Sequence, residues 1–286
     1  MITLTAPAKV NLTLEVIARR DDGFHEIKSI IQTISLADIV TMENSRETEF
    51  STNSSVWNAG QSLVAKTVAL FRETTGTDSG VSLHVEKRIP MSAGLGGDSS
   101  DAAAVLKGLN ALRETGLSRD ELHRMAEQLG SDVPFFLYGG TALMEGRGEI
   151  VTPLPSVPLM HLVLVVPDIV PLIGKTGKLY AGLKEDDFTD GAVTRRWVSA
   201  LEREKTLPDI DNVFENVARR LFPGLQEVYD TVTGLTSRKV HLAGSGPVMF
   251  VKAQDRLEAE SLSVRLIENG LKAVVTETAS PSSGGQ

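Results

Sequence analysis

A glycine-rich stretch followed by two serines is the part of the sequence whose residue types most clearly suggest chemistry. Residues 94–97 hold three glycines in four positions, and Ser99 and Ser100 follow them. A glycine backbone adopts positive φ and can approach a ligand closely. The apolar residues from Val105 to Leu112 have helical spacing, so we expect the serines at the N-cap of a helix. The free N–H groups and positive dipole end of such a helix suit a phosphate group.

Two charged residues elsewhere in the chain supply what phosphoryl transfer would still require. Lys9 stands between apolar residues of an expected strand, and Asn11 shares its face because side chains alternate with period two. Asp132 directly precedes an apolar, aromatic run. A cation offsets phosphate charge, and an acid receives the proton of the acceptor. Magnesium would bridge the phosphates, and the hydroxyl of Ser100 is a candidate ligand for it.

Each of these features also has a purely structural interpretation. A glycine-rich turn commonly precedes an ordinary surface helix. Lys9 could be a lysine with its ammonium in solvent. Asp132 could be the N-cap of a short helix, with Pro134 near the start of that helix.

Several other kinds of site are excluded by the residues at individual positions or by the absence of a motif. Gly174, Lys175 and Thr176 resemble the end of a P-loop, but Ile169 occupies the position of its leading glycine. A dinucleotide fingerprint fails because Ser99 stands where its third glycine belongs. The 5 histidines show no metal-ligand spacing, and the sequence has neither a His-Glu-x-x-His motif nor a Gly-x-Ser-x-Gly elbow.

The composition is that of a soluble globular protein. The 286 residues are 41% hydrophobic and 23% charged, and no apolar run approaches the length of a membrane span. The net charge of −8 argues against a general nucleic-acid binder. The N-terminus does not resemble a signal peptide, and the absence of cysteine excludes disulfides and thiolate metal sites. We therefore expect a cytoplasmic protein with no nucleic-acid or membrane partner.

Strands and helices alternate along the chain in a way that predicts an α+β fold. We expect strands within residues 2–18, interrupted at 6–9, and at 27–36, 39–42, 81–85, 141–144, 162–166, 240–243, 248–251 and 273–276. Helical segments are expected at 62–74, after the glycine-rich stretch, at 118–129, and near 192–204, 212–236 and 255–268. Ser118 and Glu121 form a capping box at the start of the third of these, and Gly130 ends it.

A proline-rich segment at residues 153–158 is the best candidate for a domain boundary. We therefore expect one domain over residues 1–155, which contains the glycine-rich stretch, and a second over residues 156–278. Residues 279–286 are expected to be a disordered tail.

Taken together, six separated motifs resemble those of the GHMP kinases, and the resemblance covers nearly the whole chain. No single motif is specific, but their combination in this order is. They are the stretches at residues 7–12, 20–25, 90–104, 129–136, 146–149 and 244–246.

The resemblance implies a ribosomal-S5-like N-terminal domain, a ferredoxin-like C-terminal domain and ATP-dependent phosphorylation. The segment Gly23-Phe24-His25 implies a substrate in which a cytidine diphosphate is linked to methylerythritol, phosphorylated on its 2-hydroxyl in the non-mevalonate isoprenoid route. By the same resemblance, Asp132 is the general base, and Lys9 orients it and offsets charge.

The resemblance also implies which residues bind the ligands. Residues of the glycine-rich stretch would hold the phosphates of ATP: Pro90, Met91, Ser92, Ala93, Gly94, Leu95, Gly96, Gly97, Asp98, Ser99 and Ser100. The second substrate would be bound by Asn11 at its methylerythritol end, by Phe24, His25 and Tyr180 at cytosine, and by Gly244 and Ser245. ATP and Mg²⁺ are the implied cofactors, and a monomer or homodimer is compatible with the family.

Four positions depart from the family pattern. Phe24 replaces a tyrosine, Ser62 stands where an adenine-side asparagine is common, and Pro247 replaces a small residue. Asp98 stands where a third consecutive glycine is usual, and a carboxylate beside triphosphate is unfavourable unless it turns away or faces magnesium.

Two alternatives remain open from the sequence. The chain could be a GHMP kinase for another acceptor, such as homoserine, mevalonate or a sugar. It could instead be a catalytically silent nucleotide-binding protein, which Asp98 alone supports.

Overall fold

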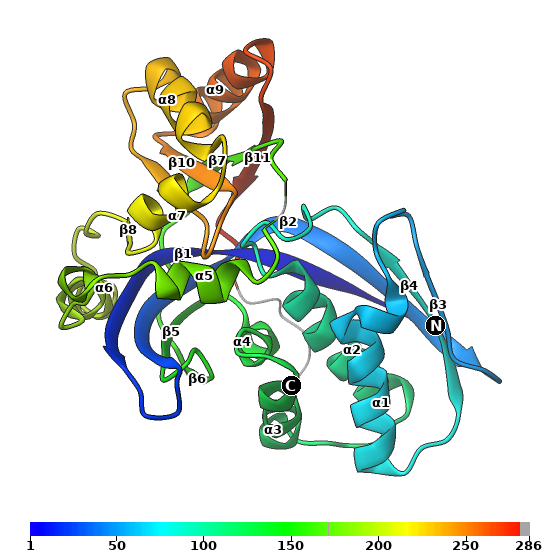
Figure 1. Ribbon diagram of the computed structural model, residues 1–286. Coiled ribbons are helices and arrows are strands. Elements are labelled where there is room, and N and C mark those ends of the chain that lie inside the picture. Colours follow the sequence, from blue (N-terminus) through cyan, green and yellow to red (C-terminus); the bar gives the residue numbers. More distant parts are fainter. Residues whose placement is uncertain (171, 281–286) are drawn as a thin grey trace. The chain divides into compact units, whose positions relative to one another are not determined.

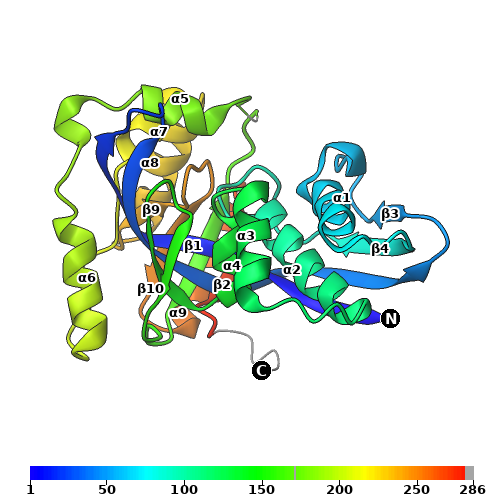
Figure 2. The ribbon, with the colours of Figure 1, turned by 90° about the horizontal axis from the view of Figure 1, so that it is seen from below.

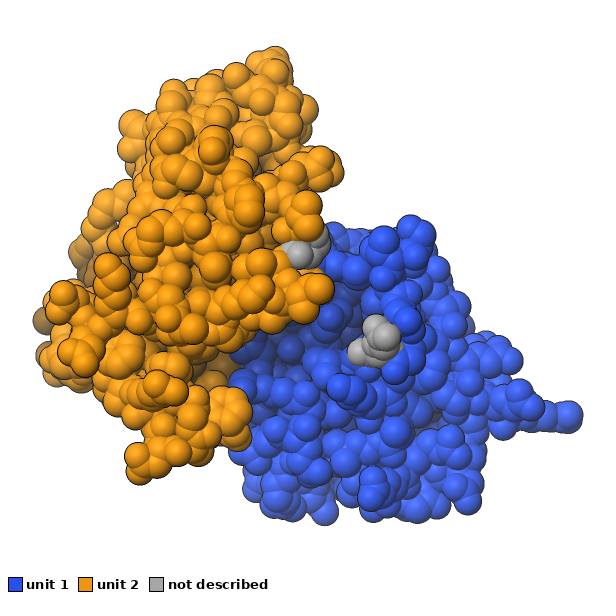
Figure 3. All heavy atoms as spheres, viewed as in Figure 1, with its two compact units in different colours: residues 1–8, 36–91, 96–139 blue, residues 9–35, 92–95, 140–286 orange. Residues whose placement is uncertain are grey.

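The computed structural model describes residues 1–170 and 172–280, and it divides them into two compact units. Unit 1 comprises residues 1–8, 36–91 and 96–139, and unit 2 comprises 9–35, 92–95 and the chain from 140 onward (Figure 3). Two long strands, β1 (Ile2–Arg19) and β2 (His25–Ser45), begin in one unit and end in the other. The domain boundary expected at residues 155–156 stays a prediction. Residues 281–286 of the expected tail lie outside the described residues.

Unit 1 combines strands with a group of helices. β4 (Gly80–Glu86) pairs antiparallel with the end of β2, from Ile39 opposite Glu86 to Ser45 opposite Gly80, and β3 (Glu49–Thr52) pairs parallel with β4. The helices α1, α2, α3 and α4 pack against one another (Figure 2). Their bounds are Leu63–Thr75, Gly97–Leu112, Arg119–Leu129 and Val133–Tyr138, and the short helix η1 spans Ala59–Gln61.

Unit 2 contains a four-stranded antiparallel sheet in the order β11-β7-β10-β9, with α8 and α9 on one face (Figure 1). Val163, Val165 and Val251 of this sheet pack with Leu262 and Leu266 of α9 in a buried core. The strands are β7 (His161–Val166), β9 (Val240–Leu242), β10 (Met249–Ala253) and β11 (Lys272–Glu277), and the helices are α8 (Leu225–Leu235) and α9 (Arg256–Glu268).

Among its described residues, unit 2 also contains three short strands beside its parts of β1 and β2, and four further helices. β5 (Thr141–Glu145) pairs antiparallel with β2 and with β6 (Ile150–Pro153), and β8 (Asp211–Asn212) pairs parallel with β1. The helices are α5 (Lys175–Ala181), η2 (Glu185–Asp187), α6 (Ala192–Glu202) and α7 (Glu215–Leu221). The predicted α+β class is confirmed.

Residues close in sequence set the ends of α1 and α3, and the capping box of α3 is as predicted. Ser62 caps α1 by accepting the N–H of Ala65, and Gly76 ends this helix in the left-handed conformation. The capping box between Ser118 and Glu121 is present at the start of α3. Such caps depend on residues close in sequence, which is why the sequence reveals them.

Three expectations about elements need correction. β1 is one strand with no interruption at residues 6–9, because Ala6 and Ala8 are buried and continue the apolar pattern. The segment at 212–236 contains two helices, α7 and α8, separated at Pro223, whose ring nitrogen has no N–H to donate. The serines do not cap α2; the helix begins earlier, at Gly97.

Candidate active site

The glycine-rich stretch leads into α2 through Gly96, which is the actual N-cap. Gly96 has a φ of 73°, in the left-handed region, and no side chain caps the helix. The N–H of Ser100 already donates to the carbonyl of Gly96 at 2.9 Å, so Ser99 and Ser100 lie in the first turn. The backbone N–H groups ahead of that bond make the start of α2 suitable for an anion, as expected from the sequence.

Residues 92–95 of this stretch belong to unit 2, where they lie directly against the turn at residues 243–247. A Cβ atom on Gly94 would lie 2.1 Å from the carbonyl oxygen of Ala243 and 2.7 Å from the nitrogen of Gly246. Gly94 also has a φ of 84°. Only glycine therefore fits where these two backbone segments meet. The carbonyl of Ala93 accepts the N–H of Val248 at 3.3 Å, which fixes the same contact.

Lys9 lies in this region of unit 2, and its side chain is buried. The residue is 5% exposed, which excludes the alternative of a lysine in solvent. Its Nζ donates to Oδ1 of Asn11 at 2.8 Å, and its backbone N–H donates to the carbonyl of Leu95 at 2.9 Å. A Cβ on Gly244 would lie 2.8 Å from the same Nζ. A side chain at position 244 would therefore collide with the ammonium of Lys9.

A chain of buried hydrogen bonds orients the Asn11 side chain. Its amide nitrogen donates to Oγ of Ser29 at 2.7 Å, and Ser29 donates to the carbonyl of Thr13 at 2.5 Å. This chain fixes the Asn11 amide so that its oxygen faces Lys9. Lys9 and Asn11 therefore share one face of β1, as the period of two predicts.

Asp132 is the N-cap residue of α4 in unit 1, with Pro134 in the first turn of that helix. The structural alternative is thus met in position, although the Asp132 side chain makes no capping hydrogen bond. α4 itself is rigidly packed, because Phe135 and Phe136 are buried and the ammonium of Lys107 donates to the carbonyl of Phe136 at 3.1 Å. Burial is the largest cause that lowers the pKa of Lys107, and Arg119 adds to it. A carboxylate not used as a cap stands at the start of this fixed helix.

The aromatic residues expected at a base-binding site lie together in unit 2, but in a different arrangement from a simple pair of rings. His25 stacks on Tyr180 with ring centroids 4.5 Å apart and an interplanar angle of 18°. Phe188 contacts the edge of His25. Phe24 is 52% exposed, and the guanidinium of Arg147 lies 4.8 Å from its ring centroid. Burial, with a smaller contribution from Arg19, lowers the pKa of His25.

Lys175 is a residue that the sequence analysis set aside with the rejected P-loop motif. Its Nζ donates to the carbonyl of Ser92 at 2.8 Å and also to the carbonyl of Gly246. Thr176 donates to Oγ of Ser245 at 3.5 Å. A cavity of about 380 Å³ is lined by Ser92 and by residues 172–177. Lys175 thus ties the glycine-rich stretch to the turn that carries Gly244 and Ser245.

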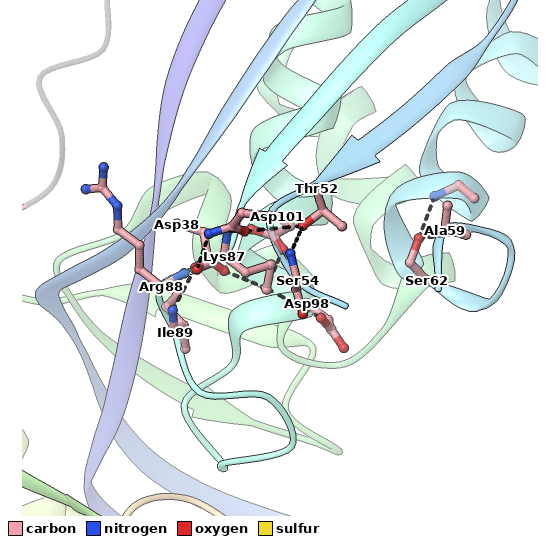
Figure 4. A network of polar contacts seen from close by, with 12 residues as sticks. Asp38, Thr52, Ser54, Ala59, Ser62, Lys87, Arg88, Ile89, Asp98 and Asp101 are labelled. Carbon is pink, nitrogen blue, oxygen red and sulfur yellow. Dashed lines mark hydrogen bonds and ion pairs between the residues drawn. The ribbon is translucent and has the colours of Figure 1, made fainter. Parts of the chain in front are cut away.

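A buried ionic cluster in unit 1, formed by Lys87, Asp38 and Asp101, is a second feature that sequence reasoning missed (Figure 4). Lys87 Nζ donates to Asp38 at 2.5 Å and to Asp101 at 2.7 Å. The unusual Asp98 lies 3.7 Å from the same ammonium, and its side chain is 60% exposed. The positive charge of Lys87 therefore offsets part of the negative charge that Asp98 brings to the glycine-rich stretch.

The side chains of Ser62 and Ser100 bear on two remaining expectations, an adenine contact at position 62 and a magnesium ligand at position 100. Besides capping α1, Ser62 donates to the carbonyl of Ala59 at 2.7 Å, so its side chain is used within unit 1. The hydroxyl of Ser100 is buried and has no hydrogen-bond partner among the described residues. An oxygen without a partner fits a hard cation, although the described part of the chain contains no group of three His, Cys, Asp or Glu side chains able to hold a metal.

Comparison with known proteins identifies the family. Residues 62–140 match the family described as GHMP kinases N terminal domain. The chain is 45% identical, over 98% of its length and 99% of the relative's, to a 4-diphosphocytidyl-2-C-methyl-D-erythritol kinase of Dehalococcoides mccartyi. It is 36% identical to a protein of the same name from Gloeobacter violaceus, over 97% of this chain and 94% of that protein.

Solved structures agree with the sequence relatives. A crystal structure of 4-(cytidine 5'-diphospho)-2C-methyl-D-erythritol kinase is similar with a TM-score of 0.82 and 34% identity, over 99% of this chain and 100% of that one. A homoserine kinase from Cytophaga hutchinsonii has a TM-score of 0.70 at 18% identity over 98% of this chain and 95% of its own, and shows a shared fold alone. Among the described residues, no helix is long and apolar enough to cross a membrane. The chain belongs to the GHMP kinases and, within them, to the 4-diphosphocytidyl-2-C-methyl-D-erythritol kinases.

Proposed function

We propose that this protein transfers the γ-phosphoryl group of ATP to the 2-hydroxyl of 4-diphosphocytidyl-2-C-methyl-D-erythritol. The observation that carries the proposal is the full-length similarity to kinases named for this substrate, at 45% identity over 98% of the chain. The substrates are small molecules, and a kinase of this family uses ATP. The buried Lys9, the close-packed glycines and the position of Asp132 at the start of the rigidly packed α4 support the proposal from the structure.

The acceptor oxygen would be activated by Asp132. In the proposed step, the 2-hydroxyl oxygen forms a bond to the γ-phosphorus while the bond from that phosphorus to the β,γ-bridging oxygen breaks. The hydroxyl proton passes to the Asp132 carboxylate, and ADP leaves with the electron pair of the broken bond. Lys9 offsets the negative charge on the transferring group, and Asn11, whose oxygen holds the Lys9 ammonium, places the methylerythritol end.

The glycine-rich stretch, residues 90–100, would bind the phosphates of ATP through its backbone N–H groups. Mg²⁺ would supply positive charge that offsets the charge of the phosphates, and Ser100, whose hydroxyl has no hydrogen-bond partner among the described residues, is the proposed protein ligand. Magnesium commonly keeps water and phosphate oxygens as most of its ligands, so it needs few ligands from the protein.

The cytidine moiety would be recognised by the aromatic group of unit 2. The stack of His25 on Tyr180 provides a ring surface, and the exposed Phe24 provides another. Phe24 offers stacking without the phenol hydroxyl of tyrosine. Gly244 and Ser245 are proposed to contact the same substrate. We propose a cytoplasmic enzyme that acts as a monomer or a homodimer.

An acceptor-specificity assay tests the proposal. Purified protein with Mg-ATP is given diphosphocytidyl-methylerythritol, homoserine, mevalonate and galactose in parallel, and phosphorylated product is measured by mass spectrometry. We expect product from the first acceptor alone. Product from another acceptor instead would identify a different GHMP kinase. ATP binding without product from any acceptor would indicate a silent nucleotide-binding protein.

A further inference from the structure

The row of buried polar side chains on β1 continues beyond Lys9 and Asn11. Thr13 and Glu15 follow on the same face of the strand, because side chains alternate with period two. Thr13 is fully buried, and Glu15 is 1% exposed. The proposed phosphoryl transfer uses Lys9 and Asn11 but neither Thr13 nor Glu15. A buried carboxylate is unfavourable unless it is well paired, so the partners of Glu15 indicate what it does.

Glu15 caps α6 from β1. Its Oε2 accepts the backbone N–H of Thr194 at 2.7 Å, and its Oε1 accepts that of Val193 at 3.4 Å. These N–H groups belong to the second and third residues of α6, where the side chain of an N-cap residue normally accepts. The N-cap residue of α6 is Gly191, which has no side chain. The carboxylate of Glu15 therefore takes over the cap, and its negative charge faces the positive end of the helix dipole.

The same carboxylate holds the segment that leads into α6. Oε1 of Glu15 also accepts the hydroxyl of Thr189 at 2.9 Å, and the backbone N–H of Thr189 donates to the carbonyl of Val16 at 2.9 Å. Phe188 directly precedes Thr189. Its ring contacts the edge of His25, with the ring centroids 6.1 Å apart and 79° between the ring planes. Glu15 thus lies one hydrogen bond and one residue away from the aromatic group of unit 2.

A series of buried hydrogen bonds connects the cap of α6 to Asn11. Oγ1 of Thr13 accepts the backbone N–H of Ile30 at 2.8 Å and lies 2.8 Å from the hydroxyl oxygen of Thr194. The carbonyl of Thr13 accepts the hydroxyl of Ser29, which in turn accepts the amide of Asn11. The polar face of β1 and the start of α6 therefore form one buried hydrogen-bond network within unit 2.

We propose that Glu15 is a positioning residue for recognition of the cytidine moiety. It caps α6 and holds Thr189, and it thereby keeps the ring of Phe188 against His25. The surface that the stacked rings of His25 and Tyr180 present to a base is fixed as a consequence. The inference rests on the proposed function, in which this aromatic group binds cytidine. Because Glu15 acts through Phe188, its loss weakens binding of cytidine diphosphate and leaves binding of ATP unchanged.

Glu15→Gln tests the proposal, because it keeps the size of the side chain but replaces one oxygen with an amide NH2 group. Val193 and Thr194 donate to different oxygens of Glu15, so one backbone N–H of α6 must then face the NH2 group. Calorimetry measures binding of cytidine diphosphate and of a non-hydrolysable imido analogue of ATP with Mg²⁺. We expect the dissociation constant of cytidine diphosphate to rise about tenfold and that of the analogue to stay within about twofold of wild type. Equal weakening of both ligands, or no change in either, would overturn the proposal.

An NMR measurement without ligand separates this proposal from the proposed function. The ring Cε1–H resonance of His25, assigned by its loss in His25→Gln, reports the packing of Tyr180 and Phe188 on that ring. Glu15→Gln should shift this resonance, whereas the resonance of His161, in β7, should stay in place. An unchanged His25 resonance would contradict the positioning role. If wild type bound no cytidine diphosphate, the cytidine site of the proposed function would fail, and the His25 resonance would still decide whether Glu15 holds Phe188.

A double variant tests whether Glu15 acts through Phe188. In a chain that carries Phe188→Leu, adding Glu15→Gln should weaken binding of cytidine diphosphate by less than about twofold, because two residues on one path do not contribute independently. Full addition of the two losses would contradict action through this ring.

Two further variants complete the design. Thr189→Val removes the hydroxyl that donates to Glu15, and we expect cytidine diphosphate to bind about threefold more weakly. Wild-type affinity in this variant would contradict the connection through Thr189. Asp255→Ala is the matched control, because it removes the side-chain cap of α9, another helix of unit 2, and should leave the affinity for cytidine diphosphate unchanged. A loss equal to that of Glu15→Gln would show that stability alone explains the effect and would overturn the proposal.

Discussion

The ends and the middle of the glycine-rich stretch are held by different forces. At its ends, in unit 1, buried charges on Lys87, Asp38 and Asp101 fix the backbone. In its middle, in unit 2, Gly94 lies against the backbone at Ala243 with no room for a side chain. Charge anchoring depends on pH and on keeping both partners, whereas close packing depends only on size. The two anchors should therefore fail in distinguishable ways.

Gly94→Ala should give the largest effect on activity. The new Cβ would lie 2.1 Å from the Ala243 carbonyl oxygen, and the φ of 84° is unfavourable for alanine, so the backbone must move. We expect turnover to fall by about 10² or more, because a small displacement of catalytic parts is costly. Gly116→Ala is the matched control: its φ of 66° imposes similar strain, but nothing lies within 4 Å of its Cβ. Steady-state kinetics measure the turnover of both variants. Similar losses of turnover in the two would contradict the packing argument.

Lys87→Met should give the largest effect on stability. It removes the ammonium and leaves Asp38 and Asp101 buried without it, which typically costs about 3–5 kcal/mol in the free energy of unfolding. Chemical denaturation measures the loss. Lys239→Met, which removes an exposed partner of Asp209, should leave the unfolding midpoint nearly unchanged. If the two substitutions had equal effects, the buried cluster would not be the anchor described.

Lys175→Met should have a smaller effect, confined to the middle of the stretch. It removes the hydrogen bonds to the carbonyls of Ser92 and Gly246, and we expect turnover to fall about three- to tenfold. The exposed Lys178, one turn away on α5, provides the control substitution Lys178→Met. Because no carboxylate of the ionic cluster is involved, the relative loss at Lys175 should be the same at pH 6 and pH 8. A loss of turnover that depended on pH would contradict the distinction between the ionic cluster of unit 1 and the close packing of unit 2.

The pH dependence of stability should give the smallest effect and the most specific one. Asp101 has a pKa of about 7 when folded and 3.8 as an unperturbed carboxyl, so the folded state holds the proton more tightly. Stability from this group is fully present below the unfolded value and is lost as pH rises from about 4 to 7. Denaturation of wild type and Asp101→Asn across this range should show wild type losing stability relative to the variant. A parallel pair of curves would refute the raised pKa.

The sequence revealed the parts of this site that rest on local spacing. Three glycines before a helix, Lys9 and Asn11 on one strand face, and Asp132 before an aromatic helix are all short-range patterns. The resemblance to GHMP kinases then linked them. Lys87 and Asp38 are 49 residues apart, and Lys175 and Ser92 are 83 apart, so no local pattern predicts either contact. The misplaced N-cap of α2 shows the same limit, since Gly96 takes the cap position that the serines favour by type.

The most direct test of the central claim is the rate of phosphoryl transfer to diphosphocytidyl-methylerythritol by wild type and Asp132→Asn. The substitution should leave the fold intact, because asparagine keeps the size and shape of the aspartate side chain. We predict that wild type forms the 2-phosphorylated product from Mg-ATP, and that Asp132→Asn is slower by about 10² or more with an unchanged unfolding midpoint. Near-normal turnover in the variant would remove Asp132 from the mechanism, and no product from folded wild type would contradict the account as a whole.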